Sequence, residues 1–343
     1  MRLSICIATF NRAAFIVDTL ESIRIQLTPD VELLVVDGGS QDGTAALMAD
    51  YVGRHPEVIY WREPENRGVD EDFDKAVRYA SGEYCWLMSD DDLLVPDAVA
   101  TVLGALADDP AVLIVNAEVR SKDMAVLLKP RQLEFDSDRA FGTAAADGFL
   151  RATGSYLTFI GAVVMRRSVW LSRERAAYYG SLFIHVGVIF QAPVLSAKVL
   201  ARPLIAIRYG NAMWTARGFD IWTEKWPRLV WSFDHLAAAA RCAVTLEHPA
   251  RNLKTLLHYR AIGAYGPSEH ERLLAGERRP RHRLARWVAV LPASAVNSAV
   301  ALYCATSRNS GSKMMLYDLC RASCGSSFTR WIARRAGVLP HAP

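Results

Sequence analysis

Cysteine is scarce in this sequence, and no arrangement of cysteines builds a scaffold. Six cysteines are spread over 343 residues without a Cys-x-x-Cys pair, and there is no internal repeat or low-complexity segment. This pattern excludes a disulfide-stapled fold and favours buried thiols in a reducing compartment. The apolar run 3–8 is too short for a secretory signal peptide, and Asn11 and Arg12 follow it closely. We therefore predict a cytoplasmic protein.

Long apolar runs are also lacking. The charge-free stretch 287–304 has 18 residues and is interrupted by polar residues and a proline, whereas a membrane-spanning helix needs about 20 apolar residues. The stretch follows five arginines: Arg278, Arg279, Arg281, Arg283 and Arg286. We predict that residues 278–304 lie on, or dip into, the inner leaflet of the cell membrane, with a buried core helix and a true span as alternatives. No nucleic-acid module accompanies the arginines, so nucleic acid is not a predicted partner.

The charge is unevenly distributed. Residues 1–200 carry 19 basic and 28 acidic side chains, a net charge of −9, whereas residues 201–343 carry 21 and 8, a net charge of +13. An acidic first part and a basic last part indicate two different tasks.

Short β-branched runs alternate with segments of helical apolar spacing four times in the first hundred residues. Such alternation predicts right-handed crossovers and a mostly parallel sheet with helices on both faces. The predicted strands are 3–8, 31–36, 58–61 and 84–88, and the predicted helices are 12–26, 42–53, 70–80 and one that opens at Pro96.

Past residue 111 the alternation loosens. Strands are predicted at 112–115, 125–128 and 159–164, and helical spacing dominates from Ile221. We therefore predict an α/β domain over residues 1–210 and a helical, basic C-terminal region over residues 211–343.

Three polar clusters follow the predicted strands, at residues 9–12, 37–40 and 89–92. In a parallel sheet the carboxyl ends of the strands share one edge, where ligands bind. Three consecutive aspartates at such an end favour a hard cation, Mg²⁺ or Mn²⁺, which takes its remaining ligands from water and substrate phosphates. The alternative is that Asp92 or Asp97 caps the next helix. Asp37 is suited to accept hydrogen bonds from a nucleobase or ribose, whereas Ser40 or Asp42 alternatively caps the following helix.

The ordered motifs resemble those of family 2 nucleotide-sugar glycosyltransferases. They are Ser4–Arg12, Val35–Thr44, Asn66–Gly68, Ala80–Tyr84 and Asp90–Asp97, and they cover residues 1–120 well and residues up to 210 more weakly. The resemblance implies the GT-A fold, a Rossmann-like α/β fold, and inverting transfer. Trp86–Asp92 and Leu182–Val188 are also similar to the abequosyltransferase-like branch that decorates lipopolysaccharide O-antigen.

The resemblance also implies roles for particular residues. Asp37 would bond the base, Asp90 would face the ribose or diphosphate, and Asp91 would be the principal metal ligand, with Asp90 beside it. The Asn66–Asp70 turn, which includes Arg67 and Asp70, would border the donor site. The residues that would line the nucleotide are Ala8, Thr9, Phe10, Asn11 and Arg12.

The sequence departs from the family pattern where a late acidic pair usually supplies the general base. No acidic residue stands between Ser181 and Ala197, and His185 is the titratable side chain there. His185 is therefore the candidate catalytic base, or alternatively a metal or diphosphate ligand, because histidine suits both tasks. A core histidine on an apolar helix is the other interpretation. Further candidates for the base are Asp147, Glu118 and Glu174.

The segment 209–217 is glycine-hinged, aromatic and basic. It is either a mobile segment that closes over the donor, with Trp214 stacked on a sugar and Arg217 near phosphate, or an interdomain linker.

Together these features predict a metal-dependent glycosyltransferase. It would pass a sugar from a nucleotide-sugar donor to a hydroxyl of a glycan acceptor carried on a polyprenyl diphosphate, in O-antigen or other surface polysaccharide synthesis. One alternative is a nucleotidyltransferase of related fold, although residues 8–12 contain no glycine for a phosphate loop. The other is a catalytically inactive, membrane-associated protein that binds nucleotide-sugars or serves as a scaffold.

Overall fold

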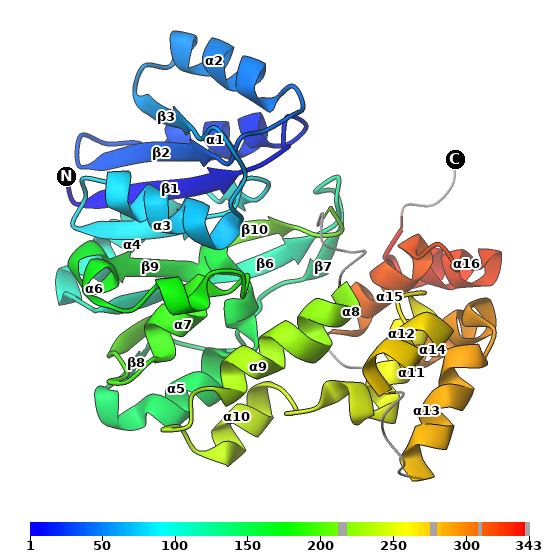
Figure 1. The fold of residues 1–343 in the computed structure, drawn as a ribbon. Coiled ribbons are helices and arrows are strands. Elements are labelled where there is room, and N and C mark those ends of the chain that lie inside the picture. The colour runs from blue at the N-terminus through cyan, green and yellow to red at the C-terminus, as the bar shows by residue number, and fades with distance from the viewer. Residues whose placement is uncertain (212–217, 275–279, 308–310, 340–343) are drawn as a thin grey trace. The chain divides into compact units, whose positions relative to one another are not determined.

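The computed structural model describes residues 1–211, 218–274, 280–307 and 311–339 (Figure 1). The chain divides into two compact units. The first, here the sheet unit, contains Met1–Glu118, Pro130–Arg208 and Ser232–Val244. The second, here the helical unit, contains Val119–Lys129, Tyr209–Trp231 and Thr245–Pro343. The predicted assignment of separate tasks to residues 1–210 and 211–343 stays a prediction.

The sheet is built around four parallel strands, as the alternating pattern predicts. Their order is β3-β2-β1-β4, and β9, β6, β10 and β5 continue the sheet. The first four strands are β1 (Leu3–Thr9), β2 (Val31–Asp37), β3 (Val58–Arg62) and β4 (Tyr84–Met88). The later strands are β5 (Leu93–Leu94), β6 (Val112–Arg120), β7 (Leu127–Lys129), β8 (Arg139–Phe141), β9 (Val163–Arg166) and β10 (Ala197–Arg208). β9 pairs antiparallel with both β4 and β6, so the parallel pairing ends at β4.

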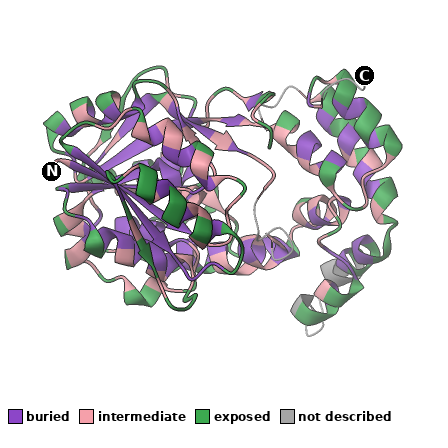
Figure 2. Cartoon of the chain, turned by 90° about the horizontal axis from the view of Figure 1, so that it is seen from above, coloured by how far each residue is buried: buried purple, intermediate pink, exposed green. Residues whose placement is uncertain are grey.

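Every residue of β1, β2 and β4 is buried, which explains their near-continuous apolar sequences (Figure 2). Among the covering helices, α3 packs on β1 and β2, and α2 packs on β3. The helices of the sheet unit are α1 (Ile16–Arg24), α2 (Thr44–Arg54), α3 (Val69–Tyr79), α4 (Ala98–Ala105), α5 (Ala146–Thr153), α6 (Arg167–Ser172), α7 (Ile184–Phe190) and α10 (Ala238–Val244). The predicted α/β class is confirmed.

One strand begins later than the sequence indicates. Residues 159–164 are predicted to be extended, but a 3-10 turn occupies Ile160–Ala162 and β9 starts at Val163. The carbonyl of Gly161 in this turn accepts a hydrogen bond of 2.8 Å from Trp86 Nε1. A buried indole that needs a partner thus competes with strand pairing.

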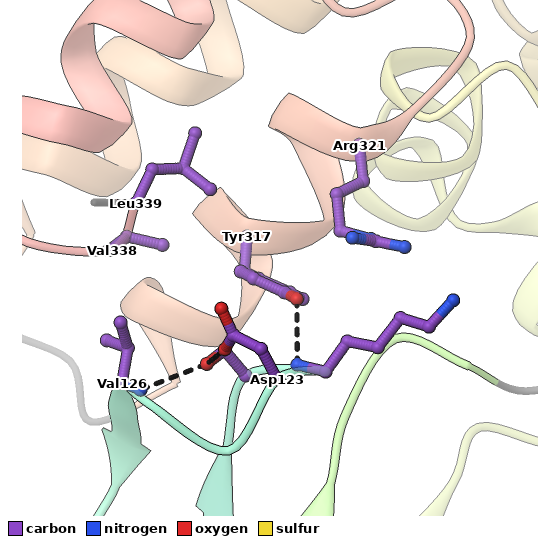
Figure 3. Close-up of a pocket in the computed structure, with 8 residues that line it drawn as sticks. Asp123, Val126, Tyr317, Arg321, Val338 and Leu339 are labelled. Carbon is purple, nitrogen blue, oxygen red and sulfur yellow. Dashed lines mark hydrogen bonds between the residues drawn. The ribbon is translucent and has the colours of Figure 1, made fainter. Parts of the chain in front are cut away.

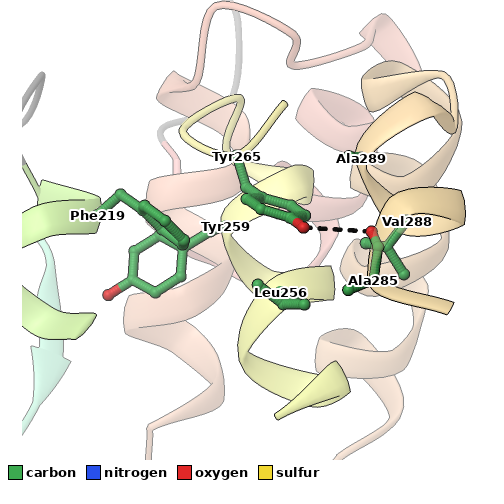
Figure 4. Packing of buried hydrophobic residues seen from close by; sticks show 7 residues of the cluster. All are labelled: Phe219, Leu256, Tyr259, Tyr265, Ala285, Val288 and Ala289. Carbon is green, nitrogen blue, oxygen red and sulfur yellow. Dashed lines mark hydrogen bonds between the residues drawn. The ribbon is translucent and has the colours of Figure 1, made fainter. Parts of the chain in front are cut away.

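The helical unit has a core of its own. Phe219, Leu256, Tyr259, Tyr265, Ala285, Val288 and Ala289 pack together there (Figure 4). Its helices are α8 (Gly218–Asp220), α9 (Trp226–Trp231), α11 (Leu253–Ala261), α12 (Pro267–Leu274), α13 (Pro280–Val290), α14 (Ala293–Thr306), α15 (Ser312–Arg321) and α16 (Ser327–Arg335), with a π-helical turn at Ile221–Lys225. The predicted helical C-terminal region is confirmed.

No single helix in the described parts of the chain is long and apolar enough to cross a membrane. The pair Leu284–Val290 and Ala293–Thr306 reaches that length and composition jointly, but the two helices are bent by 102° at the break between them.

Candidate active site at the carboxyl ends of the parallel strands

The turns after β1 and β2 are locked together. Asn11 has a positive φ of 56°, a conformation that asparagine tolerates better than most residues. Its Oδ1 accepts hydrogen bonds from the amides of Gln41 at 2.7 Å and Asp42 at 3.2 Å. The amide of Arg12 donates to Thr44 Oγ1 at 2.9 Å. These bonds fix the backbone at the tip of β1 and leave the Arg12 side chain to extend toward the end of β4.

Asp37, at the end of β2, is fully buried. Its Oδ1 accepts from the amide of Ser40 at 2.8 Å, and its Oδ2 accepts from the hydroxyl of Tyr60 at 2.6 Å. Burial, and then the bond to Asp37, raise the pKa of Tyr60, so this hydroxyl stays protonated and donates. In this structure the carboxylate therefore holds the turn, and its predicted contact with a base stays a prediction.

The acidic triplet follows β4. Arg12 lies between the first two carboxylates, with Nε 3.3 Å from Asp90 Oδ1 and Nη2 3.4 Å from Asp91 Oδ2. Burial and the charge of Asp91 raise the pKa of Asp90 to about 7. Asp92 is buried and accepts from the amide of Arg208 at 2.6 Å and from the hydroxyl of Ser89. The alternative in which Asp92 or Asp97 caps the next helix is wrong, because α4 has no side-chain cap.

The alternative that Ser40 or Asp42 caps the helix after β2 is not met in the predicted form, because the N-cap residue of α2 is Gly43 and has no side-chain cap. Asp42 Oδ1 accepts from the amide of Thr44, the first residue of α2, at 2.8 Å. Ser40 instead accepts from the amide of Asn11 at 2.9 Å, so it links the two turns rather than capping the helix.

Arg208 is a site residue that sequence reasoning missed. It lies at the end of β10, its Nε donates to the carbonyl of Asp91 at 2.9 Å, and its Nη2 donates to Asp18 at 2.9 Å. With its amide on Asp92, the residue holds the acidic loop at two points and ties it to Asp18 of α1. No local signal marks it, because β10 reaches the site through long-range pairing alone.

The side chains at the end of β4 are suitable ligands for a divalent cation. Asp90 and Asp91 offer hard oxygen ligands, and their side chains keep 11% and 13% of their surface exposed. The described residues include no group of three His, Cys, Asp or Glu side chains placed to hold a metal. The protein would therefore supply two carboxylates, and water and a diphosphate would supply the rest, as Mg²⁺ prefers.

His185, in α7, is buried among apolar neighbours. Its Nε2 lies 2.7 Å from the carbonyl oxygen of Leu157, and burial lowers its pKa to about 4. Only 1% of the residue is exposed, so an acceptor hydroxyl cannot reach the ring as it stands. This placement favours the core-histidine interpretation, and the roles of base and metal ligand stay predictions without geometric support.

Two other predicted residues lie at the start of α3. Asp70 is buried, and its carboxylate accepts from the amides of Leu182 at 2.8 Å and Ile184 at 3.0 Å, so it holds the start of α7. Arg67 is exposed and pairs with Glu65 at 2.6 Å. Trp214 and Arg217 lie outside the described residues.

Two of the alternative bases hold backbone amides. Asp147 Oδ1 accepts from the amide of Ala237 at 2.9 Å, and Glu174 Oε1 accepts from that of Ala177 at 3.2 Å. Glu118 lies near the end of β6 and is partly buried. The geometry singles out none of these three as the base.

A separate cavity of about 350 Å³ lies within the helical unit (Figure 3). Its lining includes Tyr317, whose hydroxyl accepts from the amide of Lys122 at 2.9 Å, and Arg321, which lies over the Tyr317 ring. None of the predicted site residues lines it.

Comparison with known proteins places this geometry in a family. The model of glycosyl transferase family 2 matches residues 4–134. Abequosyltransferase RfbV of Salmonella typhimurium is 24% identical over 232 residues, which are 64% of this chain and 70% of that protein. A Campylobacter jejuni enzyme, GalNAc(5)-diNAcBac-PP-undecaprenol beta-1,3-glucosyltransferase, is 27% identical over 103 residues, 30% of this chain and 33% of that protein.

A solved structure shares the fold. The crystal structure of S. aureus TarS 1–349 in complex with UDP-GlcNAc has a TM-score of 0.52 at 14% identity, covering 99% of this chain and 93% of that one. The motif set, the strand-end site and these likenesses agree: residues 4–134 are a family 2 glycosyltransferase domain, and the α/β fold is that of the GT-A class.

Proposed function

We propose that this enzyme is a metal-dependent, inverting glycosyltransferase that moves a sugar from a nucleoside diphosphate to a hydroxyl of a lipid-linked glycan. The observation that carries the proposal is the convergence of Arg12, Asp90 and Asp91 where β1 and β4 end. One cationic and two anionic side chains there suit a ligand that itself combines a divalent cation with phosphates.

The donor is a nucleotide-sugar. Among proteins of similar fold, TarS has been crystallised with UDP and with UDP-GlcNAc. In this chain Asp90 and Asp91 would hold Mg²⁺ or Mn²⁺, which neutralises charge on a diphosphate leaving group. The backbone of residues 8–12, fixed by the β2 turn, would line the nucleotide, with Asp37 below it.

In inverting transfer the acceptor oxygen loses its proton to a base and bonds to the anomeric carbon. The bond from that carbon to the diphosphate breaks, and the nucleoside diphosphate leaves with the electron pair. The described side chains do not single out the base, and His185 is buried away from solvent.

The acceptor is a lipid-linked glycan. One relative is named an abequosyltransferase, and the name of another specifies a glycan carried on PP-undecaprenol. Exposed apolar side chains on α13 and α14 support a peripheral contact with the inner face of the cell membrane, among them Trp287, 68% exposed, and Tyr303, 69% exposed. In the sequence, five arginines at positions 278–286 precede these side chains.

Donor binding tests the proposal directly. Thermal shifts of the full chain would be measured with UDP-, GDP-, CDP- and dTDP-sugars, each with Mn²⁺ and with EDTA. We expect one nucleotide class to raise the melting temperature with Mn²⁺ and to lose most of that effect in EDTA, because a ligand stabilises the state that binds it. No shift with any donor at millimolar concentration would contradict the proposal.

A further inference from the structure

Asp72, in α3, carries a buried carboxyl group. The side chain is 3% exposed, and its Oδ1 has no hydrogen-bond partner among the described residues. The ammonium of Lys75 lies 4.0 Å from Oδ1 and donates instead to Glu63 at 2.8 Å. Burial raises the pKa of the Asp72 carboxyl group to about 7. Burying a carboxylate without a donor costs free energy, and a ligand that presents a donor to it would offset that cost.

Structural roles account for the neighbouring buried carboxylates of α3 but not for Asp72. Asp70 holds the start of α7 through two backbone amides. Asp74 accepts from Trp170 Nε1 at 2.9 Å and from the hydroxyl of Tyr179 at 2.6 Å. Asp72 does not cap its own helix, because α3 begins without a side-chain cap. Its carboxyl group is therefore suited to a partner other than the fold itself.

The carboxyl group of Asp72 lies against the turn that follows β2. A Cβ added at Gly38 would come within 2.3 Å of Asp72 Oδ2, so the carboxyl group occupies the space beside this glycine. The amide of Gly38 donates to the carbonyl of Thr9, the last residue of β1, at 2.9 Å. Asp72 thus reaches the edge of the sheet at which β1 and β2 end, where ligands of such sheets bind.

The order of the strands separates this carboxyl group from the proposed metal ligands. β1 lies between β2 and β4, so the ends of β2 and β4 are two strand spacings apart, roughly 10 Å. The base and the phosphates of a nucleoside diphosphate lie on opposite sides of the ribose. A donor whose diphosphate lies at the end of β4 would therefore bring its base toward β2. There Asp37 already accepts a bond at each oxygen, whereas Oδ1 of Asp72 accepts none from the described residues.

We propose that Asp72 recognises the base of the donor nucleotide by accepting a hydrogen bond from an N–H group of that base. A carboxylate accepts equally well from the ring N–H of uracil, thymine or guanine and from the amino group of cytosine. This inference rests on the proposed nucleotide-sugar donor and names the side chain that contacts its base.

The test is the affinity of the full chain for UDP, GDP, CDP and dTDP, each with Mn²⁺, measured by calorimetry. Asp72→Asn keeps the size of the side chain and removes its charge. Glu71→Gln is the matched control, because it makes the same chemical change on the same helix at a partly exposed position. Inorganic pyrophosphate with Mn²⁺ is the control ligand, since it has no base. Circular dichroism and melting temperature would establish that each variant is folded.

We expect Asp72→Asn to bind the preferred nucleotide about tenfold more weakly than the wild type, a change of about 1.4 kcal/mol in binding free energy. Its affinity for pyrophosphate should not fall, because the contact is to the base. Glu71→Gln should stay within about threefold of the wild type for both ligands, since the loss of a partly exposed charge has a small effect.

Unchanged nucleotide affinity in Asp72→Asn, or an equal loss for nucleotide and pyrophosphate, would overturn the contact with the base and leave the proposed donor standing. Absence of nucleotide binding by the wild type would overturn both. If Asp72→Asn fails to fold, the wild type decides. An analogue of the preferred nucleotide whose base N–H groups are methylated should then bind at least about tenfold more weakly than the parent nucleotide, and equal binding would overturn the proposal.

Discussion

The two units of this enzyme differ in the charged side chains that they bury and in the aromatic side chains that they expose. In the sheet unit, carboxylates such as Asp37, Asp70 and Asp92 are buried and accept hydrogen bonds from other elements of that unit. In the helical unit, large aromatic side chains such as Trp287 and Trp331 are more than half exposed.

This difference separates two kinds of function. Buried charges are costly unless they are paired and hydrogen-bonded, so carboxylates bonded in this way indicate a region whose geometry is fixed. Exposed aromatic side chains beside arginines are typical of a surface that meets another phase or partner. Changes in the sheet unit should therefore affect transfer, and changes on the helical unit should affect where the enzyme binds.

The largest effect should follow the loss of one carboxylate in the acidic triplet. Asp91→Asn removes a charged ligand from the proposed metal site, and we expect the transfer rate to fall by about 100-fold or more, on the order of 3 kcal/mol. The measurement is sugar transfer or donor hydrolysis at saturating Mn²⁺. Asp97→Asn is the control, because Asp97 is exposed and has a φ of 65°, which asparagine also adopts. Full activity of Asp91→Asn would remove the metal site from the sheet unit.

A change in the core of the helical unit should lower the stability of the protein and leave the transfer reaction intact. The expected loss of free energy is about as large as the effect on the transfer rate predicted for Asp91→Asn. Buried Asn297 donates to the carbonyls of Ala261 and Leu319 at 2.9 Å and accepts from Thr329 at 2.6 Å, so it joins four helices. Asn297→Leu leaves these groups unsatisfied and should lower the free energy of unfolding by about 3 kcal/mol.

Urea denaturation would measure that loss, and the exposed Ser294→Ala serves as the control. Donor-induced thermal shifts of the sheet unit should persist in Asn297→Leu under native conditions. If donor binding disappeared while the protein remained folded, the separation between the two units would be wrong.

The first half of the sheet unit could be predicted from the sequence because its signals are local. β1, β2 and β4 are buried on both faces, so their sequences are apolar throughout, and the polar residues that follow them mark the edge where ligands bind. The later strands pair antiparallel and over long separations, and β9 is shortened by a turn that serves Trp86. The pairing and length of these later strands depend on residues far away in the sequence, so the local sequence gives little indication of them.

The site shows the same limit. Motifs identified Asp90 and Asp91, because consecutive carboxylates after a buried strand are unusual. They could not reveal that Arg208 anchors the loop, or that Asp70 holds the start of α7. Histidine in an apolar segment is equally suited to a core or to catalysis, and only burial and the bond to Leu157 distinguish the two for His185.

The pH dependence of stability sharpens that distinction. The pKa of His185 falls from its ordinary 6.5 to about 4 through burial, so the folded state binds fewer protons than the unfolded state between these values. This contribution to stability is present above pH 6.5 and is lost as the pH falls toward 4, by about 2–3 kcal/mol. His185→Gln should flatten that slope, whereas the partly exposed His235→Gln should leave it unchanged. Free energies of unfolding between pH 7.5 and 4.5 measure it, and an unchanged slope in His185→Gln would contradict burial as the cause.

The smallest effect should be confined to the helical unit and should concern membrane binding. Trp287→Ser removes an exposed indole from α13, and we expect binding to vesicles of phosphatidylglycerol and phosphatidylcholine to weaken about tenfold, because a buried aromatic side chain contributes about 1.5–3 kcal/mol. Trp61→Ser is the matched control, since Trp61 is 52% exposed on β3 of the sheet unit. Sedimentation with vesicles measures binding, and turnover of a soluble acceptor should be the same in both variants. Equal loss of vesicle binding in the two variants would show that both units contact the lipid, and would contradict membrane binding through the helical unit alone.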